Sequence, residues 1–193
     1  MKTPLKNVCI NILLLTSFSL LTAQTFAADD IERLTSSCTA CHGDNGVAVA
    51  KEWPSLAGQK PGYLLAQLKA FKDGSRENVL MSGLLTNFSE QELLKIADYY
   101  ASLPFDKPRS ASINKAGENV RANCISCHGM TGQTINDTWP NLAGQNKEYL
   151  LQQLKDFSSN KRHSIIMNVI ASELDEQQMQ DVAEYYEQIG TVQ

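Results

Sequence analysis

The residues of this chain that could do chemistry are concentrated in one pentapeptide pattern that occurs twice. Cysteine, two other residues, cysteine and histidine stand at residues 38–42 and again at residues 124–128. This spacing is typical of a c-type haem attachment site. Two thiols two residues apart can each form a thioether bond to one porphyrin edge, and the adjacent histidine can bind the iron as proximal ligand. The sequence therefore predicts two covalent haems, with thioether bonds from Cys38, Cys41, Cys124 and Cys127 and with His42 and His128 as iron ligands.

Two other kinds of site also use paired cysteines. A thioredoxin-like dithiol needs a βαβ context, and no strand-rich pattern is visible in the sequence. Two cysteine pairs can also bind one zinc ion through four thiolates. Here, however, the pairs are 86 residues apart and each has its own histidine. The pattern favours haem attachment over either alternative.

The motif belongs to a longer internal repeat. A shift of 86 residues aligns residues 38–103 with residues 124–189 without a gap, and 25 of these 66 positions are identical. The chain therefore contains two copies of one domain. We predict a signal peptide at residues 1–27, a first domain at 28–103, a linker at 104–113 and a second domain at 114–193.

The sixth iron ligand decides whether such a site transfers electrons or binds peroxide or a gas. Met81 and Met167 are the only methionines that align between the copies, and each follows its histidine by 39 residues. A lone methionine is usually core filler, but the shared spacing predicts that both are iron ligands. His163 is the alternative in the second copy; it aligns with Glu77, so the repeat gives it no support.

Two further repeated pairs could support the haems. Pro54 and Pro140 each follow the motif histidine by 12 residues, and their carbonyls could accept a hydrogen bond from its Nδ1 atom. Arg76 and Arg162 also align. Each could pair with haem propionates or could be an ordinary solvated surface charge.

The elements that must position these residues all have helical patterns. We expect a helix from Asp29 to Cys41 and its counterpart from Asn114 to Cys127, each ended by the next glycine. Amphipathic periodicity predicts helices at residues 62–72 and 148–157. A last helix should begin after Ser89, in a capping box with Glu92, and its counterpart should run from Asp175 to about Ile189. The predicted fold is all-α, with each domain wrapped around one covalent haem.

The first residues have the pattern of an export signal. Lys2 and Lys6 precede a short apolar run, and small residues near Ala27 and Ala28 suit cleavage. The alternative is an uncleaved N-terminal anchor. This signal pattern predicts that the protein is exported to the periplasm. The fifth cysteine, Cys9, lies inside the signal peptide and should be lost on cleavage.

Composition narrows the range of partners. Without Lys2 and Lys6 the chain has 15 basic and 21 acidic residues, a net charge of −6. This balance argues against nucleic-acid binding, which needs a basic surface, and favours redox proteins that dock through charge. It is also compatible with peripheral association with a membrane. Because each domain has only about 75–80 residues, its apolar core is marginal, and we expect haem to complete it.

These features together resemble the di-haem cytochromes c4. The resemblance rests on the two tandem motifs, the aligned methionines, and the stretch P-x-L-A-G-Q-x-x-x-Y-L-x-x-Q-L that begins at Pro54 and again at Pro140. It implies two cytochrome c domains with facing propionate edges. It also implies an electron shuttle between a quinol-oxidising complex or other donor and a terminal oxidase, with His42, Met81, His128 and Met167 as ligands.

Two other functions remain open at this stage. A di-haem peroxidase would need one haem with a displaceable sixth ligand, and a methionine in both copies argues against it. A cytochrome subunit of a larger dehydrogenase or oxidase cannot be separated from a free shuttle by sequence. We therefore predict a non-enzymatic electron carrier.

Overall fold

The computed structural model describes residues 30–191, so the predicted signal peptide and Cys9 lie outside the described residues. The chain divides into two compact units, residues 1–36 and residues 37–193. In the first unit, residues 30–35 are helical, and the Thr35 hydroxyl donates to the Ile31 carbonyl at 2.9 Å. Over residues 30–191, every helix is too short or too polar to cross a membrane.

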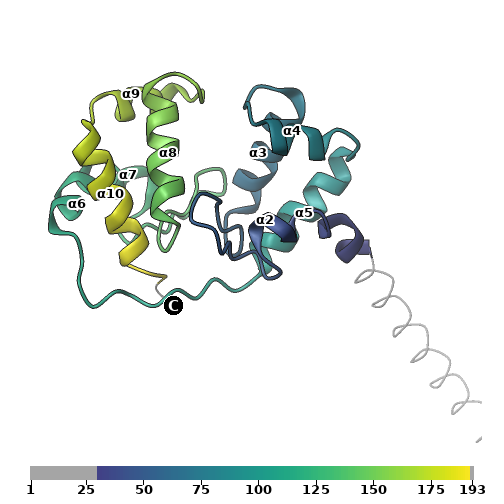
Figure 1. The fold of residues 1–193 in the computed structure, drawn as a ribbon, viewed down its shortest axis with the longest axis horizontal. Helices are drawn as coiled ribbons and strands as arrows, with labels where there is room; N and C mark the ends of the chain where they lie inside the picture. The colour runs from purple at the N-terminus through teal and green to yellow at the C-terminus, as the bar shows by residue number, and fades with distance from the viewer. Residues whose placement is uncertain (1–29, 192–193) are drawn as a thin grey trace, which may run out of the picture. The chain divides into compact units, whose positions relative to one another are not determined.

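The second unit holds both copies of the repeat, and its regular elements are all helices over the described residues (Figure 1). The first copy contains α2 (Thr39–His42), α3 (Pro61–Asp73), α4 (Val79–Leu85) and α5 (Glu90–Ser102). The second copy contains α6 (Lys115–Val120), η1 (Arg121–Asn123), α7 (Ile125–His128), α8 (Lys147–Ser158), α9 (Ile165–Ser172) and α10 (Glu176–Gln188).

The last helix of each copy begins where its capping residues predict. The Ser89 hydroxyl accepts from the Glu92 amide, and the Glu92 carboxylate accepts from the Ser89 amide. Asp175 and Gln178 form the same reciprocal pair at the start of α10. Each pair satisfies two backbone donors that a helix start would otherwise leave without partners. These two predicted starts are confirmed.

The predicted helix from Asn114 to Cys127 is wrong in one respect, because it is broken at Arg121. A 3₁₀ turn there separates α6 from α7. The Arg121 guanidinium donates to the Met130 carbonyl at 3.2 Å and lies over the Tyr185 ring. These contacts turn the chain so that the second motif stands on its own short helix. The predicted helix that ends at Cys41 in the first copy is broken as well, because residues 36–38 form turns before α2.

Each copy packs its last helix against the others to form a small core. In the second copy α10 packs on both α6 and α8. The core there consists of buried residues from α8, α10 and adjoining segments: Ala143, Leu150, Val182, Ala183, Tyr185, Tyr186 and Ile189. In the first copy α3 packs on α4 and α5, around Phe71, Leu85 and Leu93, with Met81 partly buried against them.

The segment between the copies, residues 104–114, has no helix. It is nevertheless tied down, because the Lys107 amide donates to the Thr191 hydroxyl at 2.9 Å and the Thr191 amide donates to the Lys107 carbonyl at 2.9 Å. The linker therefore lies against the C-terminal end of the second copy.

Candidate haem sites

Each motif forms one helical turn closed by a glycine. In α2 the His42 amide donates to the Cys38 carbonyl at 2.9 Å, so the turn brings both cysteines and the histidine together. Gly43 follows with φ +78°, and a Cβ there would collide with the Val47 carbonyl. Only glycine fits this close turn. Gly129, with φ +82°, does the same after α7, against the Gln133 carbonyl.

The two motif histidines are buried and held by proline carbonyls. His42 Nδ1 lies 2.8 Å from the Pro54 oxygen, and His128 Nδ1 lies 2.9 Å from the Pro140 oxygen. Because a carbonyl only accepts, Nδ1 carries the proton and Nε2 keeps its lone pair. Burial lowers the pKa of both histidines, although the proline carbonyls oppose this effect. The predicted role of both prolines is confirmed, and each imidazole is prepared to bind a metal through Nε2.

The first cysteine of each motif lies beside a buried tyrosine. Burial raises the pKa of the Cys38 and Cys124 thiols. The hydroxyls of Tyr100 and Tyr186 face these thiols and have no hydrogen-bond partner of ordinary geometry. Burial also raises the pKa of both tyrosines, so they stay neutral. The same tyrosine–thiol contact occurs at the same position in both copies.

A cavity of about 530 Å³ opens beside the first motif. Its lining brings together the predicted haem-binding residues of the first copy, namely Cys38, Cys41, His42 and Met81, with apolar side chains from α3, α4 and α5. His42 and Met81, which are 39 positions apart in the sequence, thus line the same cavity.

Both predicted methionine ligands lie on short helices that were not predicted from the sequence. The Asn78 side chain caps α4 by accepting from the amides of Leu80 and Met81, and the Ser164 hydroxyl caps α9 by accepting from the Met167 amide. Each methionine is therefore the third residue of its helix, and each is half-buried. His163 is exposed and precedes α9. Met167 occupies the position equivalent to Met81, and its role as a ligand stays a prediction.

The two repeated arginines meet in one polar cluster. The Arg76 guanidinium donates to Gln67 of its own copy and to Tyr149 and Gln153 of the other, at 2.8, 3.3 and 2.7 Å. Arg162 makes the equivalent contacts, to Gln153 at 2.8 Å, Tyr63 at 3.0 Å and Gln67 at 2.8 Å. The second arginine is only 9% exposed. The alternative that it is a solvated surface charge is therefore wrong.

This cluster has an excess of positive charge. Among residues 30–191 neither Arg76 nor Arg162 forms an ion pair with a carboxylate. Each guanidinium instead lies over a phenylalanine ring of its own copy. Burial alone would raise the pKa of Tyr149, but the two guanidiniums lower it on balance. Both arginines line the cavity, so an anionic group there would be stabilised.

The lining of this cavity fits a c-type haem. It offers a pair of thiols for the porphyrin edge, a neutral imidazole and a thioether for iron, and apolar walls for the ring. It also offers, for the propionates, two guanidiniums that form no ion pair with a carboxylate among residues 30–191. The polar partners of the two arginines were not predicted as site residues, although all four recur in the repeat: Tyr63, Gln67, Tyr149 and Gln153.

Comparison with known proteins identifies the family. The sequence profile of the cytochrome c family matches residues 28–104 and 115–189. A cytochrome c4 from Pseudomonas aeruginosa is 35% identical over 169 residues, which cover 77% of this chain and 81% of that protein. The chain belongs to the cytochrome c4 family.

Two further proteins are similar to this chain, one in structure and one in sequence. The crystal structure of reduced recombinant cytochrome c4 from Pseudomonas stutzeri matches with a TM-score of 0.75 and 29% identity, over 84% of this chain and 98% of that one. A thiosulfate dehydrogenase electron acceptor from Thiomonas intermedia is 32% identical over 167 residues, covering 78% of this chain and 77% of that protein.

Membership of the cytochrome c4 family confirms the predicted architecture and cofactors. The chain forms two tandem all-α cytochrome c domains and carries two covalent c-type haems. It is a di-haem electron-transfer cytochrome.

Proposed function

We propose that this protein is exported to the bacterial periplasm, where it carries electrons from a quinol-oxidising complex or another donor to a terminal oxidase. The observation that carries the proposal is the lining of the first cavity, which includes both His42 and Met81. The same pair of residues recurs at the same spacing in the second copy. A protein ligand on each side of the iron favours electron exchange over the binding of peroxide or a gas.

The residues of the chain contribute three things to this activity. When bound, each haem supplies an iron that gains and loses one electron. The proline carbonyls hold His42 and His128 in one tautomer and one ring orientation. The apolar helix faces exclude water, and Arg76 and Arg162 place positive charge beside the cavity.

Charge and targeting support the proposed location and partners. The predicted mature chain has a net charge of −6, which suits docking to a positively charged surface on a redox partner. The signal pattern at residues 1–27 supports export, which also suits the thioether chemistry of c-type haems.

The proposal can be tested with reduced holo-protein and respiratory membranes. We expect the membranes to reoxidise the protein in the presence of oxygen, and we expect an inhibitor of terminal oxidases to stop this reaction. High salt should slow it, because salt screens charge-steered docking. Oxidation by peroxide without membranes, with turnover, would instead support a di-haem peroxidase.

A second candidate function has one specific observation in its favour. The relative from Thiomonas intermedia is named as an electron acceptor of thiosulfate dehydrogenase. Oxidised holo-protein would then be reduced by thiosulfate when a thiosulfate dehydrogenase is present. Reduction by that enzyme but not by a quinol-oxidising complex would make this the better assignment.

A further inference from the structure

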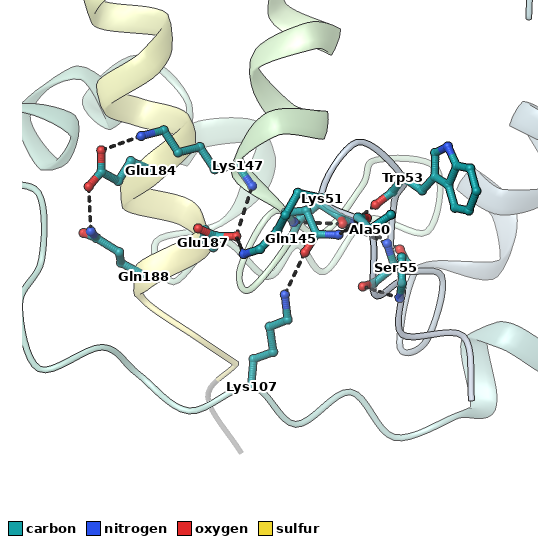
Figure 2. A network of polar contacts seen from close by, with 12 residues as sticks. Ala50, Lys51, Trp53, Ser55, Lys107, Gln145, Lys147, Glu184, Glu187 and Gln188 are labelled. Atoms are coloured by element: carbon teal, nitrogen blue, oxygen red, sulfur yellow. Dashed lines mark hydrogen bonds and ion pairs between the residues drawn. The ribbon is translucent and has the colours of Figure 1, made fainter. Parts of the chain in front are cut away.

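The loop that carries Pro54 is held by side chains of the other domain. The Gln145 side chain accepts from the Ser55 amide at 2.9 Å and donates to the Ser55 carbonyl at 2.9 Å. The next residue, Asn146, donates to the Trp53 carbonyl at 2.8 Å and to the Ala50 carbonyl at 3.4 Å. Figure 2 shows this network between the second domain and the loop. The backbone on both sides of Pro54 is therefore fixed by the second domain.

The held segment is the one that orients the first histidine. The Pro54 carbonyl, between the two gripped residues, accepts the hydrogen bond from His42 Nδ1 at 2.8 Å. Any shift of Trp53 or Ser55 moves that carbonyl. Gln145 of one domain is thus connected, through the backbone of residues 54–55, to the imidazole of the other.

We call the hydrogen bonds from the side chains of Gln145 and Asn146 to residues 50–55 the grip. Its side chains are buried, and further hydrogen bonds hold them in place. Gln145 is 5% exposed, Asn146 1% and Ser55 3%. The Gln145 oxygen also accepts from the Asn146 amide at 3.0 Å, and the Asn146 oxygen accepts from Lys107 Nζ at 2.9 Å. Because buried polar groups are costly when unpaired, these side chains have little freedom to move.

The reverse contact also exists. Gln59 of the first domain accepts from the Asn141 amide at 2.7 Å and donates to its carbonyl at 3.0 Å. Asn141 follows Pro140, whose carbonyl holds His128. Lys60 stands where the second copy has Asn146, so the first domain lacks that part of the grip. The two contacts are therefore pseudo-symmetric but not identical, because on the reverse side Asn141 also donates to the Gly58 carbonyl at 3.0 Å.

We infer that Gln145 and Asn146 are positioning residues for the first haem and that Gln59 is a positioning residue for the second. Each acts across the domain interface, through the proline carbonyl that orients the axial histidine. A hydrogen bond at Nδ1 makes the imidazole a more basic ligand, which stabilises oxidised iron. Loss of the grip weakens that bond and raises the reduction potential of the haem in the opposite domain. The inference rests on the proposed electron-carrier function.

The test is a crossed pair of substitutions in the full-length holo-protein. Gln145→Met and Gln59→Met keep side-chain length and remove the hydrogen bonds. The two haem potentials are measured by spectroelectrochemistry at high ionic strength and assigned by NMR of the haem methyl groups. We expect Gln145→Met to raise the potential of the first haem alone and Gln59→Met that of the second alone. The expected size is several-fold in the reduction equilibrium, where tenfold corresponds to about 59 mV for one electron.

Two further variants make the result specific. Asn146→Ser should also raise the potential of the first haem only, by less than Gln145→Met, and it is the milder change if the glutamine variant fails to fold. Glu187→Gln removes the Lys51–Glu187 ion pair, which crosses the same interface at 2.7 Å without touching residues 53–55. It should leave both potentials in place. Hydrogen exchange of the Ser55 amide should accelerate in Gln145→Met and not in Glu187→Gln.

The outcomes separate this inference from the proposed function. If both potentials stay fixed in Gln145→Met and Asn146→Ser, or if each variant moves both haems equally, the grip only fastens the domains and the inference is wrong. If the wild-type protein itself lacks two reversible one-electron potentials, the electron-carrier function fails instead.

Discussion

At the scale of single residues, the sixth ligand of the second haem is the assignment that a substitution can decide. Met167 is half-buried in α9, whereas His163 is exposed before it. We predict that Met167→Ala halves the far-red sulfur-to-iron charge-transfer band of the oxidised protein. It should also lower one potential, because Met/His ligation raises it. His163→Ala should change neither, as followed by absorption and redox titration.

Met179 provides the matched control for this prediction. It lies in α10 and is only 5% exposed, as expected of a core residue. Met179→Leu should keep the charge-transfer band at full intensity. A band that survives Met167→Ala and disappears in His163→Ala would reverse the ligand assignment.

The two arginines between the domains make a second residue-scale prediction. A buried positive charge beside an iron favours the reduced state, since reduction removes one positive charge from the site. Arg162→Leu should therefore lower both haem potentials by tens of millivolts, where about 59 mV is tenfold for one electron. Arg162→Lys keeps the charge but loses the forked contacts to Tyr63 and Gln67, so its shift should be smaller. Equal shifts in both variants would show that hydrogen bonding, not charge, sets the effect.

At the scale of helices, the crossing of α6 and α10 depends on one small residue. Gly117 is buried in α6, and a Cβ there would collide with the Asp181 carbonyl and press on Tyr185. Because a backbone group cannot swing aside, Gly117→Ala should destabilise the holo-protein by roughly 1–3 kcal/mol in urea unfolding. Gly83 in α4 is the control, since nothing lies within 4 Å of a Cβ there. Gly83→Ala should instead stabilise by roughly 0.5–1 kcal/mol.

Helix starts and the repeat could be predicted because they depend on residues close together in the sequence. Ser89 and Glu92 form their capping box within four residues, and the amphipathic pattern of α3 repeats in α8. The short helices α4 and α9 were missed because seven or eight residues give too little periodicity to recognise. The break at Arg121 was missed because it depends on contacts with Met130 and Tyr185, which only the folded chain brings near.

The contacts of the candidate sites also fall into two groups, those that local spacing predicts and those that depend on the folded chain. The thioether cysteines, the axial histidines and the proline carbonyls follow from local spacing, and the last of these contacts is confirmed at 2.8 and 2.9 Å. The cross-domain bonds of Gln145 and Asn146 could not be predicted. They join residues about 90 positions apart, and no periodicity indicates which side chains meet at an interface between two copies.

At the scale of the whole molecule, the haem cavity adjoins the small apolar core of the first domain. The buried cluster of the first domain that includes α4 consists of Phe71, Leu85 and Leu93, and Met81 packs against it from the cavity side. A cavity of about 530 Å³ therefore adjoins this cluster. Empty apolar space forfeits the contacts that hold a domain together.

We therefore predict that haem attachment and folding are coupled. Protein made without the attachment machinery should show much less helix by circular dichroism than the holo-protein, because small domains cannot offset the entropy of ordering without a filled core.

Cys124→Ala with Cys127→Ala should lose the haem and most helix of the second domain, and mass spectrometry should show one covalent haem in place of two. The first domain should then lose stability as well, since Gln145 and Asn146 no longer hold residues 53–55 in place. A control with Cys9→Ala should keep both haems and full helix content. Apo-protein with the helix content and cooperative unfolding of the holo form would show that the polypeptide alone specifies the fold.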